Sequence, residues 1–176
     1  VGAWAGELLK QLNLKLPLNP IRKTFAWYNA DEMLYKENLF PGFTFQVGTK
    51  SYYGFPSIDG AGLKIGRHDG GDTVNPDEER QPFGDEDAAD LNQFLHTYMP
   101  YAGTLKNGKT CMYTMTPDED FIIDLHPAYK NIAIAAGFSG HGFKFASAVG
   151  EVLSELLIKG STHLDISPFA IKRFNS

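Results

Sequence analysis

The feature that most constrains the fold is a glycine-rich segment between an apolar run and a helical pattern. The apolar run, residues 131–136, favours a buried strand, and Gly137-Phe-Ser-Gly-His-Gly-Phe-Lys144 follows it directly. A helix start carries unpaired amide donors and the positive end of the helix dipole. The glycines at 137, 140 and 142 allow a flat group to approach the main chain. The segment therefore predicts a site for an anion, or for a ring that accumulates negative charge.

Helical patterns occur in three places. Apolar spacing indicates a first helix that ends near Leu12 and a second that begins at Ala88, after an acidic loop over 69–87. A long third helix begins after the glycine segment and ends at Gly160, which occupies a typical C-cap position.

Alternating side chains between hairpin-type turns predict an antiparallel sheet. The expected strands cover 24–28, 43–47, 51–55 and 63–68, and later extended segments cover 110–115, 121–124 and 132–136. The tail over 162–176 is expected to be mostly irregular because Pro168 interrupts it. The fold class is therefore α+β.

Composition narrows the class of function. The net charge of −5 and the pI of about 5.5 give no basic footprint for nucleic acid or an anionic membrane, so we expect neither partner. A single cysteine, Cys111, excludes an internal disulfide framework and a multi-cysteine zinc site, and a cytoplasmic, reducing setting fits best. The chain opens at Val1 without an initiator methionine or a secretory signal, so we expect a piece of a longer protein.

Residues on the strand over 63–68 are the first candidates for chemistry. Side-chain alternation places Lys64, Gly66 and His68 on one face, and Tyr53 and Phe55 share a face of a neighbouring strand. These side chains could line one cavity. The alternative is that Lys64 and His68 lie on the solvent-exposed face of an antiparallel sheet.

Cys111 has two readings. A lone cysteine in an extended, apolar context is often inert packing. It could instead be a nucleophile, assisted by Lys109, that forms a covalent thioether with an electrophilic cofactor.

Lys144 and His141 are ambiguous candidates at the glycine segment. A cation in a first helical turn opposes the dipole, so Lys144 is favourable there only if it reaches a carboxylate or a ligand oxygen; a solvated lysine is the alternative. The remaining histidines, at 96, 126 and 163, show no metal-ligand pairing, and we expect no metal site.

Ser139 resembles the nucleophile of a serine hydrolase, since it follows a strand and precedes a helix. The elbow pattern requires a glycine two residues later, where this chain has His141. A hydrolase using Ser139 is therefore the weakest alternative.

Several motifs, in order, resemble the family of monomeric sarcosine oxidase and N-methyltryptophan oxidase. The motifs are Tyr52-Tyr-Gly-Phe-Pro56, Gly62-Leu-Lys-Ile-Gly66, Cys111-Met-Tyr-Thr114, Phe121-Ile-Ile-Asp-Leu-His-Pro127, Ala135-Ala-Gly-Phe-Ser-Gly-His-Gly-Phe-Lys-Phe145 and Asp165-Ile-Ser-Pro-Phe169. The resemblance extends over nearly the whole chain.

The resemblance implies a covalent flavoprotein. Cys111 would carry FAD through a thioether, and Lys64 would activate oxygen beside the flavin. The positions around the amine substrate would be Tyr53, His68 and Tyr113, with Lys144 serving the substrate carboxylate and the pyrimidine edge of the flavin. The other cofactor-binding positions would be Met112, Gly140, His141 and Gly142.

The implied reaction is oxidative demethylation of sarcosine or another N-methyl amino acid, with O₂ as oxidant and formaldehyde and hydrogen peroxide as products. By the same resemblance, residues 1–20 would end one FAD-domain segment, 21–110 would form the substrate domain, and 111–176 would be the carboxy-terminal strands and helix of a Rossmann-like FAD domain. The Gly-x-Gly-x-x-Gly fingerprint of that domain is missing, so the isolated chain is expected to be inactive without an amino-terminal half. A noncatalytic ligand-binding module is the alternative from another class.

Overall fold

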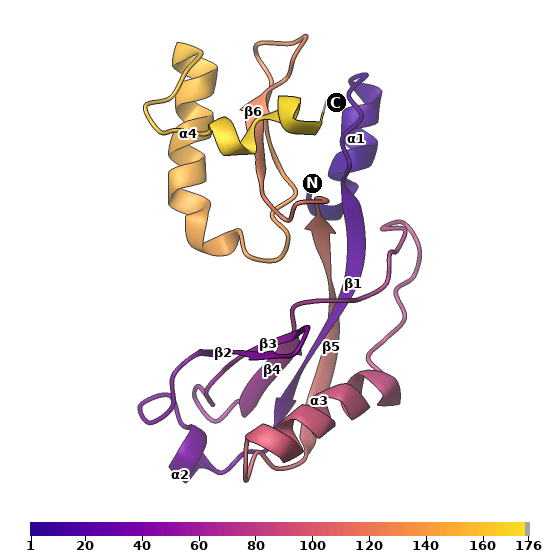
Figure 1. The fold of residues 1–176 in the computed structure, drawn as a ribbon, viewed down its shortest axis with the longest axis vertical. Helices are drawn as coiled ribbons and strands as arrows, with labels where there is room; N and C mark the ends of the chain where they lie inside the picture. The colour runs from indigo at the N-terminus through magenta and orange to yellow at the C-terminus, as the bar shows by residue number, and fades with distance from the viewer. Residues whose placement is uncertain (175–176) are drawn as a thin grey trace. The chain divides into compact units, whose positions relative to one another are not determined.

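The computed structural model describes residues 1–174, and the chain forms two compact units (Figure 1). The inserted unit comprises Arg22–Asp72 and Glu79–Cys111. The terminal unit comprises Val1–Ile21, Thr73–Glu78 and the chain from Met112 onward. Two of the boundaries between the units, after Ile21 and after Cys111, fall inside strands. These strands are β1 (Asn19–Tyr28) and β5 (Leu105–Met115).

A five-stranded sheet of order β2-β3-β4-β1-β5 organises the inserted unit. Strands β2 (Phe43–Val47), β3 (Lys50–Phe55) and β4 (Leu63–Arg67) form an antiparallel meander, and β4 pairs antiparallel with β1. The short helix α2 (Glu32–Tyr35), which the sequence pattern does not indicate, starts where the Asp31 carboxylate accepts a hydrogen bond from Met33 N at 2.8 Å.

One face of this sheet is the core of the inserted unit, and helix α3 (Asp85–Tyr98) lies across it (Figure 1). Leu63 and Ile65 are completely buried there, and the Tyr52 ring stacks on Phe94 with centroids 4.1 Å apart. The other buried members of this core are Ala26, Tyr28, Tyr35, Leu91, Leu95, Met99 and Ala102. Because strand side chains alternate, the residues between these core positions must emerge on the opposite face.

An ion pair joins β1 to the start of α3. Arg22 donates two hydrogen bonds to the Asp87 carboxylate, at 3.0 and 2.7 Å, and both side chains are largely buried. The hydrogen bonds from Arg22 hold the pKa of Asp87 below its ordinary value against the opposing effect of burial. Asp87 also accepts from Gly84 N at 2.9 Å, which fixes the beginning of the helix.

In the terminal unit, the hairpin β6 (Ile122–Leu125) and β7 (Ala133–Ala136) packs against helix α4 (Ala146–Lys159) (Figure 1). Its remaining elements are helix α1 (Ala5–Gln11) and 3-10 helices at Gly2–Trp4, Phe143–Phe145, Ser167–Phe169 and Ile171–Phe174. Helix α4 ends at Gly160, whose φ of 74° and amide bond to Leu156 O confirm the predicted C-cap.

The α+β prediction is confirmed, but three predicted starts are wrong by three residues or more, and β3, β4, β6 and β7 differ from their predicted ranges by one residue at one or both ends. Strand β1 starts five residues earlier than predicted. Pro20 has no N–H to donate, but its carbonyl accepts a hydrogen bond from Val74 N at 2.9 Å, so the extended chain is held there. Strand β5 also starts five residues earlier than predicted. Its added residues include Gly108, where the Phe83 ring occupies the space that a side chain would take. Helix α3 starts three residues early, with an acidic first turn that suits the helix dipole.

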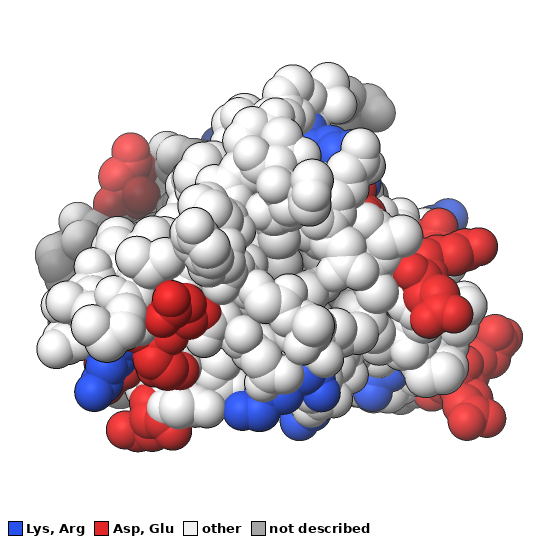
Figure 2. All heavy atoms as spheres, turned by 90° about the horizontal axis from the view of Figure 1, so that it is seen from below, with Lys and Arg blue, Asp and Glu red and all other residues white. Residues whose placement is uncertain are grey.

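The tail predicted as irregular contains the last two 3-10 helices, and positions 175 and 176 of that prediction lie outside the described residues. Within residues 1–174, no helix has the length and apolarity needed to span a membrane. Figure 2 shows acidic and basic side chains interspersed around the margin of one largely uncharged face.

Candidate functional site

The face of the sheet opposite α3 carries a lysine surrounded by aromatic rings, which we call the lysine face. Strand register places Lys64 directly between Trp27 on β1 and Phe55 on β3. Gly66, two residues further along β4 on the same face, pairs with Phe25 on β1 and with Tyr53 on β3. The predicted sharing of one face by Tyr53, Phe55, Lys64 and Gly66 is therefore confirmed. The prediction that β4 extends to His68 is wrong, because the strand ends at Arg67, so strand register does not place His68 on this face.

The Lys64 ammonium contacts rings rather than carboxylates. Its Nζ lies 4.5 Å from the Phe25 centroid, 5.4 Å from that of Trp27 and 5.8 Å from that of Phe55. Lys64 takes part in no ion pair among the described residues, and its side chain is half-buried. The site thus presents a positive charge that no neighbouring carboxylate neutralises.

Gly66 makes room for the phenol of Tyr53. A Cβ at position 66 would lie 2.8 Å from the Tyr53 hydroxyl oxygen, so the ring lies directly against the strand where a side chain is missing. Tyr53 is half-buried in this position. The glycine gap therefore places a hydroxyl on the face of the sheet that carries Lys64.

Cys111 is the last residue of the inserted unit and lies on β5, the strand next to β1 in the sheet. Lys109 reaches the Trp27 ring at 5.7 Å, and since side chains two apart share a face, Cys111 lies on the same side of β5. Its thiol is half-buried and unbridged. Burial raises the pKa of Cys111, and the positive charge of Lys64 is the largest of the effects that oppose this rise.

His68 follows β4 and is anchored through its main chain. Its amide donates to Ser51 O at 2.7 Å, and its carbonyl accepts from the Lys23 ammonium at 2.6 Å. Lys23 is only 4% exposed and also donates to Gly70 O. A buried ammonium requires such acceptors, so Lys23 fixes the main chain that carries His68.

The terminal unit holds the glycine segment in a tight turn after β7. Gly137, Ser139 and Gly140 all have positive φ, at 63°, 48° and 78°. The Tyr113 ring lies against Gly140, because a Cβ there would come within 2.1 Å of it. The turn therefore orients Tyr113 by leaving space for its ring.

The Ser139 side chain is used to hold this turn together. It is completely buried, its Oγ donates to Gly137 O at 3.2 Å, and it lies 3.4 Å from the Thr116 hydroxyl. A nucleophile elbow presents an exposed hydroxyl. This geometry disfavours the hydrolase alternative.

A cavity of about 570 Å³ adjoins the turn within the terminal unit. Four of the residues that the family resemblance assigns to the cofactor or the amine line it, namely Met112, Tyr113, Gly140 and Gly142. Most of the other lining residues are small, including Gly2, Ala5, Ala135, Ala136 and Ala146. Such a lining suits a flat ring that approaches the main chain.

His141 and Lys144 belong to the same segment but do not line this cavity. The His141 ring packs 4.8 Å from the Phe121 ring, and its Nδ1 lies 3.1 Å from Ser139 O. Lys144 is exposed, with Nζ 5.2 Å from the Phe145 centroid. It lies in the 3-10 helix that leads into α4.

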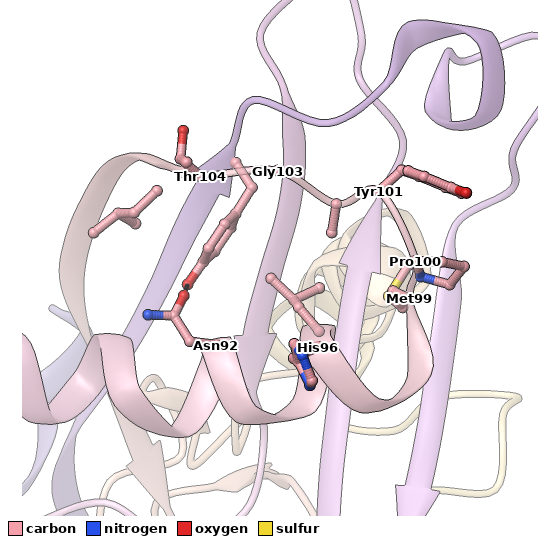
Figure 3. Close-up of a pocket in the computed structure, with 11 residues that line it drawn as sticks. Asn92, His96, Met99, Pro100, Tyr101, Gly103 and Thr104 are labelled. Carbon is pink, nitrogen blue, oxygen red and sulfur yellow. Dashed lines mark hydrogen bonds between the residues drawn. The ribbon is translucent and has the colours of Figure 1, made fainter.

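A second cavity, of about 510 Å³, lies in the inserted unit (Figure 3). Asn92 and His96 reach it from α3, Tyr101 and Thr104 come from the following loop, and the Tyr28 hydroxyl donates to the Asn92 side chain at 2.8 Å. It contains none of the residues predicted to act in catalysis or in cofactor binding.

Sequence reasoning missed three members of the lysine face and its support, namely Lys23, Phe25 and Trp27, and it named Lys109 only as a neighbour of Cys111. Alternation in residues 24–28 does place Phe25 and Trp27 on one face. The order of strands, which brings them beside Lys64, has no local signal in the sequence.

The FAD dependent oxidoreductase (DAO) family matches residues 1–156, and the chain belongs to this family. Within it, the chain is 52% identical over 177 residues to monomeric sarcosine oxidase of Arthrobacter sp. (strain TE1826), covering 98% of this chain and 46% of that protein. It is 44% identical over 173 residues to N-methyl-L-tryptophan oxidase of Citrobacter koseri, covering 97% of this chain and 46% of that protein. The family resemblance inferred from the motifs is confirmed. The chain spans about half the length of these curated relatives.

Solved structures share the fold. L-proline dehydrogenase from P. horikoshii matches 99% of this chain and 46% of its own, with a TM-score of 0.81 and 25% identity. Glycine oxidase from Geobacillus kaustophilus matches 98% of this chain and 44% of its own, with a TM-score of 0.79 and 20% identity.

Each unit, taken by itself, carries residues whose chemistry suits FAD. In the terminal unit, the small-residue cavity beside the glycine turn suits a flat ring, and main-chain amides near a helix start suit negative charge. In the inserted unit, a half-buried free thiol and an unneutralised ammonium share the lysine face. These groups have the chemistry that an attachment point and an electrostatic partner require.

Proposed function

We propose that this chain is the carboxy-terminal portion of an FAD-dependent oxidase that demethylates sarcosine or another N-methyl amino acid. The proposed net reaction consumes the secondary amine, water and O₂, and yields the demethylated amine, formaldehyde and hydrogen peroxide. The relatives named above, at 52% and 44% identity, support this class of substrate. The isolated chain is proposed to be inactive, because it spans less than half of those relatives.

The observation that carries the proposal is the lysine face, where an ammonium without a carboxylate partner lies on the side of the sheet that carries Tyr53 and Cys111. FAD, when bound, supplies the acceptor for the two electrons taken from the substrate N-methyl group and passes them to O₂. The fixed charge of Lys64 would stabilise negative charge that develops on oxygen. The Cys111 sulfur would form the thioether that anchors the cofactor; the thiol would lose its proton and the flavin carbon a hydride equivalent, whose two electrons O₂ would accept.

The remaining predicted residues take proposed positioning roles. Tyr53 and His68 would bind and orient the amine. The Tyr53 ring lies against Gly66, and the Lys23 ammonium holds the main chain of His68. Tyr113 would also lie around the bound amine, and Lys144 would serve the substrate carboxylate and the pyrimidine edge of the flavin. The cofactor-binding residues would be Met112, Gly140, His141 and Gly142, with the inserted unit as substrate domain and the terminal unit as part of the FAD domain.

Mass spectrometry of the full-length protein tests the tether. A peptide containing Cys111 should carry the mass of the flavin and absorb visible light. An unmodified, colourless Cys111 peptide from active full-length protein would refute the attachment while leaving the reaction class open.

Half-reaction kinetics test the role of Lys64. In the full-length enzyme, Lys64→Met should slow reoxidation by O₂ about 100-fold or more, and flavin reduction by substrate far less, because the charge acts on oxygen. Lys10→Met, which removes an exposed lysine from α1, is the matched control and should change neither step. Equal slowing of both half-reactions in Lys64→Met would remove the assigned role. Comparing sarcosine with a bulkier N-methyl amino acid in the same assay identifies the substrate.

A further inference from the structure

We propose that Phe25, Trp27 and Phe55 are positioning residues that hold the Lys64 ammonium in place by cation–π contact while leaving its charge unneutralised. This inference rests on the proposed function, since it explains how that lysine can serve oxygen chemistry. It assigns a role to three residues, none of which lies on the strand of Lys64: Phe25 and Trp27 belong to β1 and Phe55 to β3.

The three contacts surround one charge. Lys64 Nζ lies within 6 Å of the three ring centroids, at 4.5 Å for Phe25, 5.4 Å for Trp27 and 5.8 Å for Phe55. This is the range in which the ring quadrupole attracts a cation. A carboxylate would also fix the ammonium, but its opposite charge would cancel the field that a reacting oxygen experiences. Aromatic rings carry no net charge, so they restrain the side chain and preserve its field.

Strand pairing and ring contacts hold the aromatic side chains beside the Lys64 ammonium. Trp27 and Phe55 stand directly opposite Lys64 on the two strands that flank β4. The Phe25 ring packs edge-on against Trp27, with centroids 5.3 Å apart and an interplanar angle of 70°. Lys109 contacts the Trp27 ring as well, at 5.7 Å. Trp27 is thus fixed by a neighbouring ring and by contacts with two cations.

The rings are also separable from the core. Trp27 and Phe25 are only half-buried, and they lie on the face opposite the residues that pack under α3. Their truncation should therefore leave the inserted unit folded. A purely structural role would predict lost stability, whereas the positioning role predicts a change in the Lys64 side chain and in one half-reaction.

The test uses the full-length enzyme with Trp27→Leu, Phe25→Leu and the ring-preserving control Trp27→Phe. In protein labelled with ¹³C-lysine, the Lys64 side-chain signal, identified by its loss in Lys64→Met, should show an upfield ring-current shift. That shift should decrease in both leucine variants and persist in Trp27→Phe. Stopped-flow kinetics should show reoxidation slowed about 5-fold in the leucine variants, with flavin reduction unchanged.

Each outcome decides a different question. An unchanged Lys64 signal in both leucine variants, or equal slowing of both half-reactions, would overturn the positioning role. If Lys64→Met itself leaves reoxidation unchanged, the proposed function of Lys64 fails, and a ring-dependent Lys64 signal would still establish the cation–π restraint. If Lys64→Met slows reoxidation but the leucine variants do not, the proposed function stands and the inference is wrong.

Discussion

Alanine at position 66 tests the placement of the Tyr53 phenol. The added Cβ would lie 2.8, 2.9 and 3.0 Å from the Oη, Cζ and Cε1 atoms of Tyr53, all closer than van der Waals contact allows. These atoms belong to the far end of a half-buried side chain, so the ring can rotate away without moving the strand. Overpacking costs about 1 to 3 kcal/mol, and we expect Gly66→Ala to lie near 1 kcal/mol.

Two further glycines calibrate this value. At Gly54 the Cβ would lie 2.2 Å from the main-chain oxygen of Lys64, which no side-chain rotation can relieve, so Gly54→Ala should cost about 3 kcal/mol or more. Gly150, on helix α4, has open space around it, and Gly150→Ala should stabilise the protein by about 0.5 to 1 kcal/mol. Urea unfolding of the three variants measures these differences.

The functional consequence separates displacement of Tyr53 from general damage. In the full-length enzyme, Gly66→Ala should raise KM for the amine about 5-fold, because the displaced phenol no longer orients the substrate. The reasoning is refuted if Gly66→Ala and Gly54→Ala destabilise equally, or if Gly66→Ala leaves KM unchanged.

Two pH-dependent effects follow from charges in the inserted unit. Burial raises the pKa of Cys111, so in flavin-free protein its alkylation by iodoacetamide should begin at a higher pH than alkylation of a free thiol. Lys64→Met should raise that onset pH further, because the positive charge of Lys64 lowers the pKa of the thiol. Any contribution of this thiol to stability is present below the ordinary cysteine pKa and is lost as pH rises through the pKa of the folded state. Arg22 lowers the pKa of Asp87, so this pair stabilises the fold above the ordinary aspartate pKa of 3.8, and that stability is lost as pH falls through the folded value. Asp87→Asn should therefore cost about 2 kcal/mol at pH 7, measured by urea unfolding, and the difference from wild type should shrink below pH 4. A constant difference from pH 7 to pH 3 would contradict the ion-pair explanation.

Local patterns in the sequence were sufficient for much of the fold. Alternation correctly placed Lys64 and Gly66 on one face, and Gly160 correctly marked the end of α4. The early starts of β1 and β5 could not be predicted, because Pro20 and Gly108 are tolerated there only through partners distant in sequence, Val74 and Phe83.

The candidate site was predictable in its residues but not in its surroundings. Trp27 lies 37 positions before Lys64, and only the antiparallel pairing of β1 with β4 brings them together. Likewise, nothing local indicates that Lys23 is buried beneath the main chain of His68. Long-range pairing decides which side chains surround a charge, and that information is distributed over the whole chain.

The interleaving of the two units along the chain has a consequence for biosynthesis. Residues 22–72 and 79–111 complete the inserted unit before Met112 leaves the ribosome, whereas the terminal unit must wait for its last segment. Vectorial synthesis therefore favours early folding of the half that carries the ammonium and the thiol. During translation, the sulfur of Cys111 can therefore join its sheet while the residues that follow it are still leaving the ribosome.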